Sequence, residues 1–259
     1  MVAKKVWITG ASSGIGRQMA LDAAREGHIP ILIARNEKRL RAIQIEIESL
    51  GGQAYIAKLD VSDFGKVDKV LNDLLLIVGG IDVLINNAGF AVFRYLKDAP
   101  IAEIKEMFDV NVVGLIYVTQ RLLPEMMNQQ SGHIINIASQ AGKFPTPKAS
   151  VYAATKHAVL GFTNSLRMEL EDTNIRVSSV NPGPIRTAFF ERADEEGSYV
   201  KNVDKWMLPP EYVSKKVIQL IKQPKRELNL PRWMNVGSTL YQLMPRVVER
   251  IAGKKLNKK

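Results

Sequence analysis

Tyr152 and Lys156 are the two residues whose types and spacing most clearly suggest chemistry. They lie four residues apart in a stretch with helical periodicity, so their side chains share one face of the predicted helix. A nearby ammonium group stabilises a phenolate relative to the phenol, which lowers a tyrosine pKa from its usual value of about 10. Such a tyrosine can donate a proton to a carbonyl oxygen or accept one from an alcohol. The alternative is a half-buried tyrosine beside a surface lysine, and the surrounding motifs must decide.

A serine follows an apolar run thirteen positions before this tyrosine. Ser139 comes directly after residues 134–138, which read as a buried strand. A hydroxyl at that point lies at the carboxyl edge of a parallel sheet, where doubly wound folds bind their ligands. The serine therefore favours a catalytic interpretation of the tyrosine and lysine.

The first predicted strand runs into a glycine-rich loop from which a helix begins. Its glycines are spaced Gly-x3-Gly-x-Gly, which differs from the Gly-x-Gly-x2-Gly of long-chain dehydrogenases. Glycines let the backbone approach a pyrophosphate, whose charge is met by free N–H groups and the positive helix end. A glycine turn without a ligand is the alternative, but the position after the first strand favours a dinucleotide site. The residues expected to contact the cofactor here are Gly10, Ser12, Ser13, Gly14, Ile15 and Gly16.

The second predicted strand ends in Ala34 and Arg35, where a dinucleotide site reads the adenosine ribose. An acidic residue at the strand tip would bind the 2′-hydroxyl of NAD and repel the 2′-phosphate of NADP. Ala34 stands at the tip instead, and Arg35 can bind a phosphate through a charge-assisted contact. We therefore predict NADP(H) as the cofactor. The alternatives are a solvated surface arginine and an NAD site supported by Glu37, and Arg39 and Arg41 are also nearby.

Two further strand ends carry candidate cofactor residues. Asp60, followed by Val61, can accept a hydrogen bond from the adenine amino group, or it can be a turn aspartate. Asn87, Ala88 and Gly89 follow the fourth strand, and their small side chains let the backbone lie close to a ribose or to a neighbouring strand. The sequence does not separate these uses.

Short apolar runs alternate with longer helical segments along most of the chain, which is typical of repeated βα units. The predicted strands are residues 5–9, 30–34, 53–59, 83–86, 133–138 and 175–180, and the predicted helices are residues 15–26, 37–50, 66–77, 104–128 and 151–172. Gly27 and Gly51 suit the ends of the first two helices, and Asn36 suits the start of the second. We predict an α/β fold, a single doubly wound, Rossmann-like parallel sheet with helices on both faces, in one domain over residues 1–259.

Taken together, these motifs resemble those of the short-chain dehydrogenase/reductase family, in its single-domain branch of about 250 residues. The resemblance covers roughly residues 5–190 in order and spacing. The matching segments are residues 9–16, residues 86–89, Ser139, residues 152–156 and residues 181–183.

The resemblance implies a role for each matching residue. Tyr152 would be the general acid/base, and Lys156 would lower its pKa and bind the nicotinamide ribose. Ser139 would hold the substrate oxygen and stabilise developing charge. Asn111 would kink its helix and support a water relay to the lysine, although an asparagine on a solvated helix face is the alternative, and Asn87 would contact the cofactor ribose. The other cofactor contacts would come from Ala88, Gly89, Pro182, Gly183, Ile185 and Thr187.

The resemblance also supports the expected cofactor. NADP-preferring members often carry a small residue and then a basic one at the positions of Ala34 and Arg35. Others place a basic residue in the glycine loop, where this chain has Ser13. One of the two known phosphate anchors is therefore present.

Composition narrows the remaining function classes. The 36 lysines and arginines against 26 acidic residues give a net charge of +10, which suits nucleic acid, anionic lipid or a phosphorylated cofactor. No nucleic-acid-binding module is recognisable, so no nucleic acid partner is expected. The chain has no cysteine and three scattered histidines, so no metal site is expected. No apolar run approaches the roughly 20 residues of a membrane span, and no targeting segment is expected, so we predict a cytoplasmic protein.

The last third of the chain is the least regular. Residues 184–210 read as a long loop with scattered apolar groups, which we predict to be a substrate loop or lid. Residues 246–259 form a basic tail in which six cations accompany Glu249. Apolar residues at helical spacing precede and enter this tail: Leu240, Met244, Val247, Val248 and Ile251. Pro245 limits this helix to residues 245–252, so packing on the body or on a partner is favoured over a membrane-surface contact.

These observations predict an NADP(H)-dependent oxidoreductase that interconverts a small-molecule carbonyl and a secondary alcohol, assembled as a homodimer or homotetramer. The alternative is a catalytically silent nucleotide-sensing or interaction protein on the same fold, because a fold does not determine a function. The presence of Ser139, Tyr152 and Lys156 together favours the enzyme.

Overall fold

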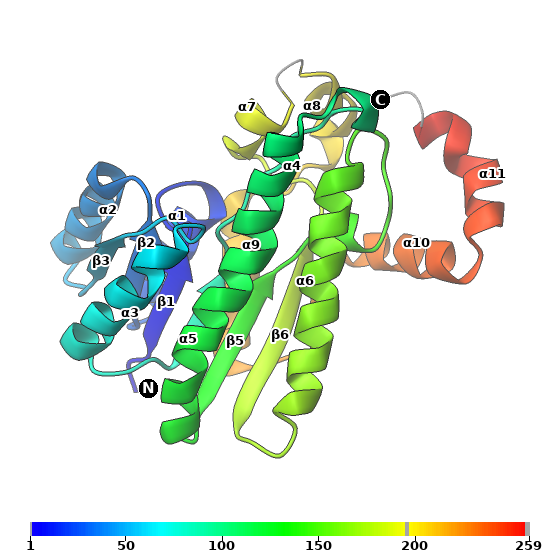
Figure 1. Ribbon diagram of the computed structural model, residues 1–259. Coiled ribbons are helices and arrows are strands. Elements are labelled where there is room, and N and C mark those ends of the chain that lie inside the picture. The colour runs from blue at the N-terminus through cyan, green and yellow to red at the C-terminus, as the bar shows by residue number, and fades with distance from the viewer. Residues whose placement is uncertain (1, 195–196, 257–259) are drawn as a thin grey trace.

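The computed structural model describes residues 2–194 and 197–256, which fold around one parallel sheet (Figure 1). Its seven strands are arranged in the order β3-β2-β1-β4-β5-β6-β7. Their bounds are β1 Lys5–Thr9, β2 Ile29–Ala34, β3 Tyr55–Lys58, β4 Val83–Asn86, β5 Gly132–Ile137, β6 Ile175–Pro182 and β7 Glu227–Leu230. The strand order reverses between β1 and β4, and a doubly wound sheet opens its ligand crevice at such a point.

Helices cover both faces of the sheet, as predicted. One apolar core joins the sheet to α1 (Gly14–Arg25), α2 (Glu37–Ser49) and α9 (Pro210–Lys222). A second core joins the opposite face to α3 (Phe64–Val78), α5 (Leu115–Asn128) and α6 (Ser150–Glu169), which lie in front of the sheet in Figure 1. Alternate residues of one strand enter different cores, Val6 and Ile8 the first and Trp7 the second. The fold class is therefore confirmed.

Local signals at the helix ends behave as the sequence suggests. The Asn36 side chain accepts a hydrogen bond of 3.0 Å from the Arg39 backbone N–H at the start of α2. Gly27 and Gly51, which follow α1 and α2, both have a backbone φ of 80°. A side chain is strained in this left-handed region, so glycine ends both helices.

The predicted helix over residues 104–128 is interrupted. It consists of α4 (Ile101–Phe108), a π-helical segment (Asp109–Gly114) and α5. The π segment contains Asn111, so the helix departs from regular α geometry at the residue expected to kink it. A π segment inside a helix often marks a functional site.

The prediction of a loop over residues 184–210 is wrong in part. The segment contains α7 (Phe189–Ala193), α8 (Ser198–Val203) and a 3-10 turn (Asp204–Trp206). Its two ends are paired, because the backbone N–H of Leu208 donates to the Pro184 carbonyl at 2.8 Å. Helices of five and six residues are too short to produce a recognisable period.

The C-terminal third contains elements that the sequence pattern did not define. After α9 and β7 come α10 (Arg232–Leu243) and α11 (Pro245–Leu256). Pro245 begins α11 as predicted, but the helix continues beyond residue 252 through Gly253. For Ile251, Lys254 and Lys255 the structure describes the backbone and not the side chains, and Lys258 and Lys259 lie outside the described residues, so the contacts expected of these side chains stay a prediction. No helix of the described residues is long and apolar enough to cross a bilayer.

A buried histidine in the sheet makes the stability of the fold depend on pH. The Nε2 of His133, on β5, lies 2.8 Å from the Ser178 hydroxyl, which itself donates to the Lys225 carbonyl. Among the described residues, Nδ1 has no hydrogen-bond partner. Burial lowers the pKa of His133 to about 4, because a proton on Nδ1 would be charged and unpaired.

We expect the free energy of unfolding to decrease as the pH falls from 6.5, the ordinary value, towards about 4. Over that range the unfolded chain binds a proton that the folded chain excludes, which removes roughly 2 to 3 kcal/mol. Urea unfolding at a series of pH values measures this slope. His133→Gln does not titrate and should flatten it, leaving the part due to His28, whose pKa burial also lowers. An equal slope in the variant would contradict the assignment.

Candidate active site

The glycine loop connects β1 to α1 and leaves no room for a side chain at Gly10 or Gly16. A Cβ on Gly16 would lie 2.2 Å from the Gly10 carbonyl oxygen, and one on Gly10 would lie 2.8 Å from the Ala88 Cα. Gly10 and Gly14 have φ values of 65° and 54°. No side chain caps the start of α1, since Ser13 at the N-cap makes no such hydrogen bond. The first N–H groups of α1 therefore have no side-chain acceptor.

The end of β4 fixes this loop in place. The Thr9 hydroxyl oxygen accepts hydrogen bonds from the backbone N–H groups of Asn87 and Ala88, at 2.9 and 3.0 Å. In return, the Asn87 amide nitrogen donates to the carbonyls of Thr9 and Gly10. The nitrogen of Asn87 is thus used to position the glycine loop.

The ends of β2 and β3 form one end of the cleft. Arg35 and Arg39 both line it, with the Arg35 guanidinium 3.7 Å from a carboxylate oxygen of Asp60. Asp60 is also a turn aspartate, because its other oxygen accepts hydrogen bonds from the Ser62 N–H and hydroxyl. Burial raises the pKa of Asp60, but these hydrogen bonds and the Arg35 charge outweigh it and lower the pKa overall. Glu37, considered as support for NAD, does not line the cleft.

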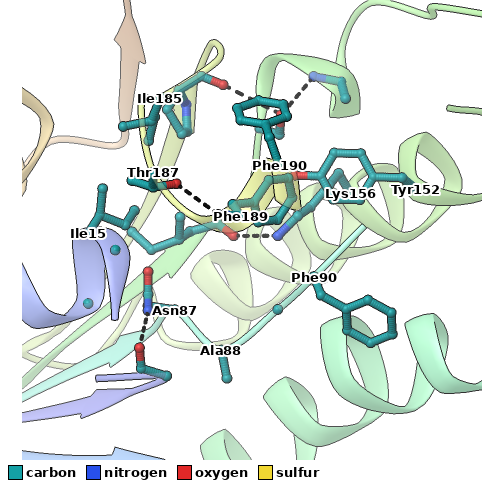
Figure 2. Close-up of a pocket in the computed structure, with 18 of the residues that line it drawn as sticks. Ile15, Asn87, Ala88, Phe90, Tyr152, Lys156, Ile185, Thr187, Phe189 and Phe190 are labelled. Atoms are coloured by element: carbon teal, nitrogen blue, oxygen red, sulfur yellow. Dashed lines mark hydrogen bonds between the residues drawn. The ribbon is translucent and has the colours of Figure 1, made fainter. Parts of the chain in front are cut away.

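Ser139, Tyr152 and Lys156 meet at the other end of the cleft. The Ser139 oxygen accepts a hydrogen bond of 3.0 Å from the Ala141 N–H, and its own proton has the Pro182 carbonyl at 3.5 Å. The Lys156 ammonium donates to the Ile137 carbonyl at 2.9 Å and lies 5.7 Å from the Tyr152 ring centroid. Figure 2 shows Tyr152 and Lys156 side by side from α6.

The electrostatics of this group differ from the prediction in one respect. Burial raises the pKa of Tyr152 above its ordinary value, and hydrogen bonding to Ser139 opposes this only in part. Burial also lowers the pKa of Lys156 to about 8. The expected lowering of the tyrosine pKa is therefore wrong for the chain alone, because loss of water around the phenolate outweighs the other effects.

Asn111 acts through the backbone of a neighbouring loop. Its side-chain oxygen accepts from the Phe90 N–H at 2.9 Å, and its nitrogen donates to the Phe90 carbonyl at 2.8 Å and to the Thr155 hydroxyl at 3.2 Å. Asn111 is fully buried and does not line the cleft. It ties the π segment to the loop after β4 and to the helix that carries Tyr152 and Lys156.

Apart from Asn111, the predicted site residues surround one cleft of about 730 Å³. Each residue predicted to contact the dinucleotide lines it, including Pro182, Gly183, Ile185 and Thr187 on the wall after β6. Gly14 faces Thr187 across the cleft, because a Cβ there would lie 3.6 Å from the threonine side chain.

Sequence reasoning missed the apolar wall near Tyr152. The Tyr152 ring lies 6.1 Å from Phe93 and 6.0 Å from Phe189, and Tyr199 lies 4.8 Å from Phe93 (centroid distances). The aromatic residues and the methionine that line the cleft and were not predicted at the site are Phe90, Phe93, Phe144, Phe189, Phe190, Tyr199, Trp233 and Met234. Phe189 and Phe190 lie in the segment that the sequence predicted to be a substrate loop with scattered apolar groups. Arg39 was also missed as a lining residue, although its place in the first turn after the β2 tip was a usable signal.

Comparison with known proteins agrees with this geometry. A family model described as short chain dehydrogenase matches residues 4–197. An uncharacterized oxidoreductase of Staphylococcus epidermidis is 37% identical over 187 residues, which are 72% of this chain and 80% of the relative. A serine dehydrogenase in its closed form with NADP+ is 33% identical with a TM-score of 0.80, over 87% of this chain and 94% of that chain.

A further neighbour shows the fold alone. A short-chain dehydrogenase/reductase of Burkholderia phymatum in complex with NAD has a TM-score of 0.87 over 95% of both chains, at 23% identity. Structures of this architecture have therefore been solved with NAD as well as with NADP+.

Proposed function

This chain belongs to the short-chain dehydrogenase family of oxidoreductases, and we propose that it transfers a hydride between NADP(H) and a carbonyl or secondary alcohol. The observation that carries the proposal is the meeting of Ser139, Tyr152 and Lys156 at one end of a cleft whose other end is a glycine loop. The reacting group and the cofactor can therefore lie in one continuous space. When bound, the nicotinamide supplies or accepts the hydride.

The residues present fit a dinucleotide. Gly10 and Gly16 let the loop pack tightly against its own backbone and the end of β4, where any Cβ would collide, and the uncapped start of α1 presents N–H groups suited to a pyrophosphate. Arg35 and Arg39 supply two positive charges at the end where a 2′-phosphate would lie. The NADP+ complex of the serine dehydrogenase supports the same choice by similarity.

Side chains of this protein bind the substrate oxygen and transfer the proton. The Ser139 oxygen already accepts from Ala141, and its contact with Pro182 is long. Its hydroxyl also hydrogen-bonds Tyr152, so a substrate oxygen that lies between the two can accept from both. Tyr152, held as a phenol by its raised pKa, donates a proton to that oxygen. Lys156 places an ammonium beside the tyrosine, where it stabilises the phenolate that the transfer leaves. Asn111 positions the helix that carries both residues.

The substrate side of the cleft favours an apolar molecule around the reacting carbonyl. Aromatic rings from the loop after β4, from α7 and from α8 surround Tyr152. We assign residues 184–210 as the lid over this space, because α7 and α8 supply Phe189, Phe190 and Tyr199 to its wall. Assembly as a homodimer or homotetramer stays a prediction.

A test is oxidation of NADPH in the presence of a panel of ketones and aldehydes. Turnover of at least one carbonyl supports the proposal. Tight NADPH binding without turnover of any of them would instead indicate a nucleotide-sensing protein.

The cofactor preference depends on Arg35 and Arg39. We expect the Arg35→Ala/Arg39→Ala double variant to bind NADPH at least tenfold more weakly, since each charge-assisted contact to a phosphate contributes about 1 kcal/mol or more even when exposed. The Kd for NADH should change little, because NADH lacks the 2′-phosphate. Titration of both cofactors by fluorescence measures the two constants. Arg41→Ala is the matched control, because Arg41 lies outside the cleft and bonds Gln44. Equal Kd values for NADPH and NADH in the wild type would refute the preference.

A further inference from the structure

The two C-terminal helices stand apart from the sheet. Figure 1 shows α10 and α11, coloured orange to red, extending away from the body, with α11 joined to it through α10. We call this pair the C-terminal hairpin, residues 232–256. One side of α10 packs on the body of the protein. Met234 and Ser238 on this side line the cleft, and Tyr241 packs on Phe144 at a centroid distance of 5.1 Å.

The opposite face of α10 is apolar and exposed. Trp233, Val236, Leu240 and Leu243 recur at helical spacing and therefore share one face. Their exposed fractions include 54% for Trp233, 62% for Val236 and 73% for Leu243. Met244 and Val247 continue the exposed apolar surface into the start of α11. Large apolar side chains gathered in this way mark an interaction surface.

Tryptophan is concentrated at the same place. Of the three tryptophans in the chain, Trp7 is buried in the sheet, and the other two lie against each other at a centroid distance of 5.4 Å. Trp206 comes from the turn that follows α8, so this pair joins the lid to the hairpin. Tryptophan favours the boundary between lipid and water, where one end of the ring is apolar and the other is wet.

The charge of the chain is also concentrated there. Residues 232–259 contain seven lysines and arginines and one acidic residue, Glu249, whereas the other 231 residues contain 29 and 25. The last 28 residues thus carry +6 of the net +10. The Glu249 carboxylate accepts a hydrogen bond of 2.9 Å from the Tyr241 hydroxyl, so one of its oxygens already has a partner within the hairpin. Arg246 and Arg250, exposed on α11, flank the apolar residues.

We propose that the C-terminal hairpin docks this enzyme on an anionic lipid surface, from which the cleft takes a lipophilic carbonyl substrate. The charge and the composition of the hairpin together indicate a lipid surface as its partner. Apolar and tryptophan side chains would enter the headgroup region, while arginines and lysines would contact anionic headgroups. A second copy of this chain would bring a second strongly basic hairpin against the first. The substrate part rests on the proposed function, and the docking part does not. The path of a substrate from the lipid surface to the cleft is short, because Trp233 lies on the exposed face of α10 and also lines the cleft.

Docking is tested with the whole protein and no cofactor. The wild type should sediment with vesicles of phosphatidylcholine and phosphatidylglycerol, remain in solution with phosphatidylcholine alone, and be released by salt. Arg246→Gln/Arg250→Gln should weaken partitioning tenfold or more. Val236→Gln/Leu243→Gln should weaken it similarly. The matched controls Lys69→Gln/Lys97→Gln and Ile45→Gln/Leu76→Gln remove equal charge or exposed apolar groups elsewhere and should bind as the wild type does.

Several results would overturn docking. Docking is wrong if the wild type does not sediment with anionic vesicles. It is also wrong if the hairpin variants bind the vesicles as the wild type does, or if the control variants lose binding as much as the hairpin variants do. A wild type that stays in solution and sediments as an oligomer, with Val236→Gln/Leu243→Gln monomeric, would assign the surface to a second copy.

The substrate part is tested by turnover. Val236→Gln/Leu243→Gln should lower the rate on a long-chain ketone held in anionic vesicles at least fivefold and leave the rate on a short, water-soluble ketone unchanged, because neither residue lines the cleft. Equal rates on the vesicle-held ketone would overturn it. If the wild type turns over neither these ketones nor any carbonyl of the panel, the proposed function fails, and the vesicle-binding result stands by itself.

Discussion

Tyr152→Phe should reduce turnover of carbonyl substrates on the order of a thousandfold, because it removes the proton donor from the reacting oxygen. The ring is expected to stay in place, since its contacts with Phe93 and Phe189 do not involve the hydroxyl. Steady-state oxidation of NADPH measures the rate, and fluorescence titration measures NADPH binding. Cofactor affinity should be close to that of the wild type, so the loss would lie in the chemical step.

Tyr199 provides the matched control for this substitution. It is a second tyrosine of the same cleft, partly buried, and it stacks on Phe190 at a centroid distance of 5.5 Å. Tyr199→Phe removes a phenol without removing the one beside Lys156, so turnover should change only severalfold. Activity that survives Tyr152→Phe, or an equal loss in both variants, would contradict the assignment of Tyr152 as the proton donor.

The end of a strand was the most reliable signal in the sequence. Ser139, Asn87 and Asp60 each come just after a predicted strand, and the carboxyl ends of parallel strands meet at one edge of the sheet. The structure brings all three to the same cleft. The glycine loop and the four-residue spacing of Tyr152 and Lys156 were recognisable because each is a local sequence pattern with a fixed geometry.

The C-terminal third lacked such patterns. β7 is four residues long and mostly half-buried, so it shows neither a continuous apolar run nor clear alternation. In α10 the apolar residues face outward, whereas a period is normally read as the side that faces the core. Leu240 and Val247 fit one apolar stripe in the sequence, but Pro245 begins a new helix and places them on different elements.

The aromatic wall and the pKa values required the tertiary structure. Phe93 follows β4, whereas Phe189 and Tyr199 lie in the segment after β6, and only folding brings their rings together. Likewise, the sequence shows that a lysine is near Tyr152 but not how much water surrounds the phenol. Burial therefore raises a pKa that proximity to an ammonium was expected to lower.

The burial of Lys156 leads to the second large effect, which concerns pH. Its pKa is lowered to about 8, so the ammonium is charged below that pH and neutral above it. If the charge stabilises the Tyr152 phenolate, the rate of carbonyl reduction should be level below about pH 8 and fall about tenfold per unit above it. Tyr152 itself does not produce this limb, because its pKa is raised out of this range.

Lys156→Met separates this account from a purely structural role of the lysine. Methionine has a similar length and no charge, so the rate should fall about a hundredfold to a thousandfold, as when another charge-stabilising group is removed. The remaining activity should show no inflection near pH 8, since the titrating group is gone. Measurement of kcat against pH in both proteins, with NADPH binding followed over the same range, distinguishes the cases. An inflection near pH 8 that persists in Lys156→Met would assign it to another group, and the lysine would then act by position rather than by charge.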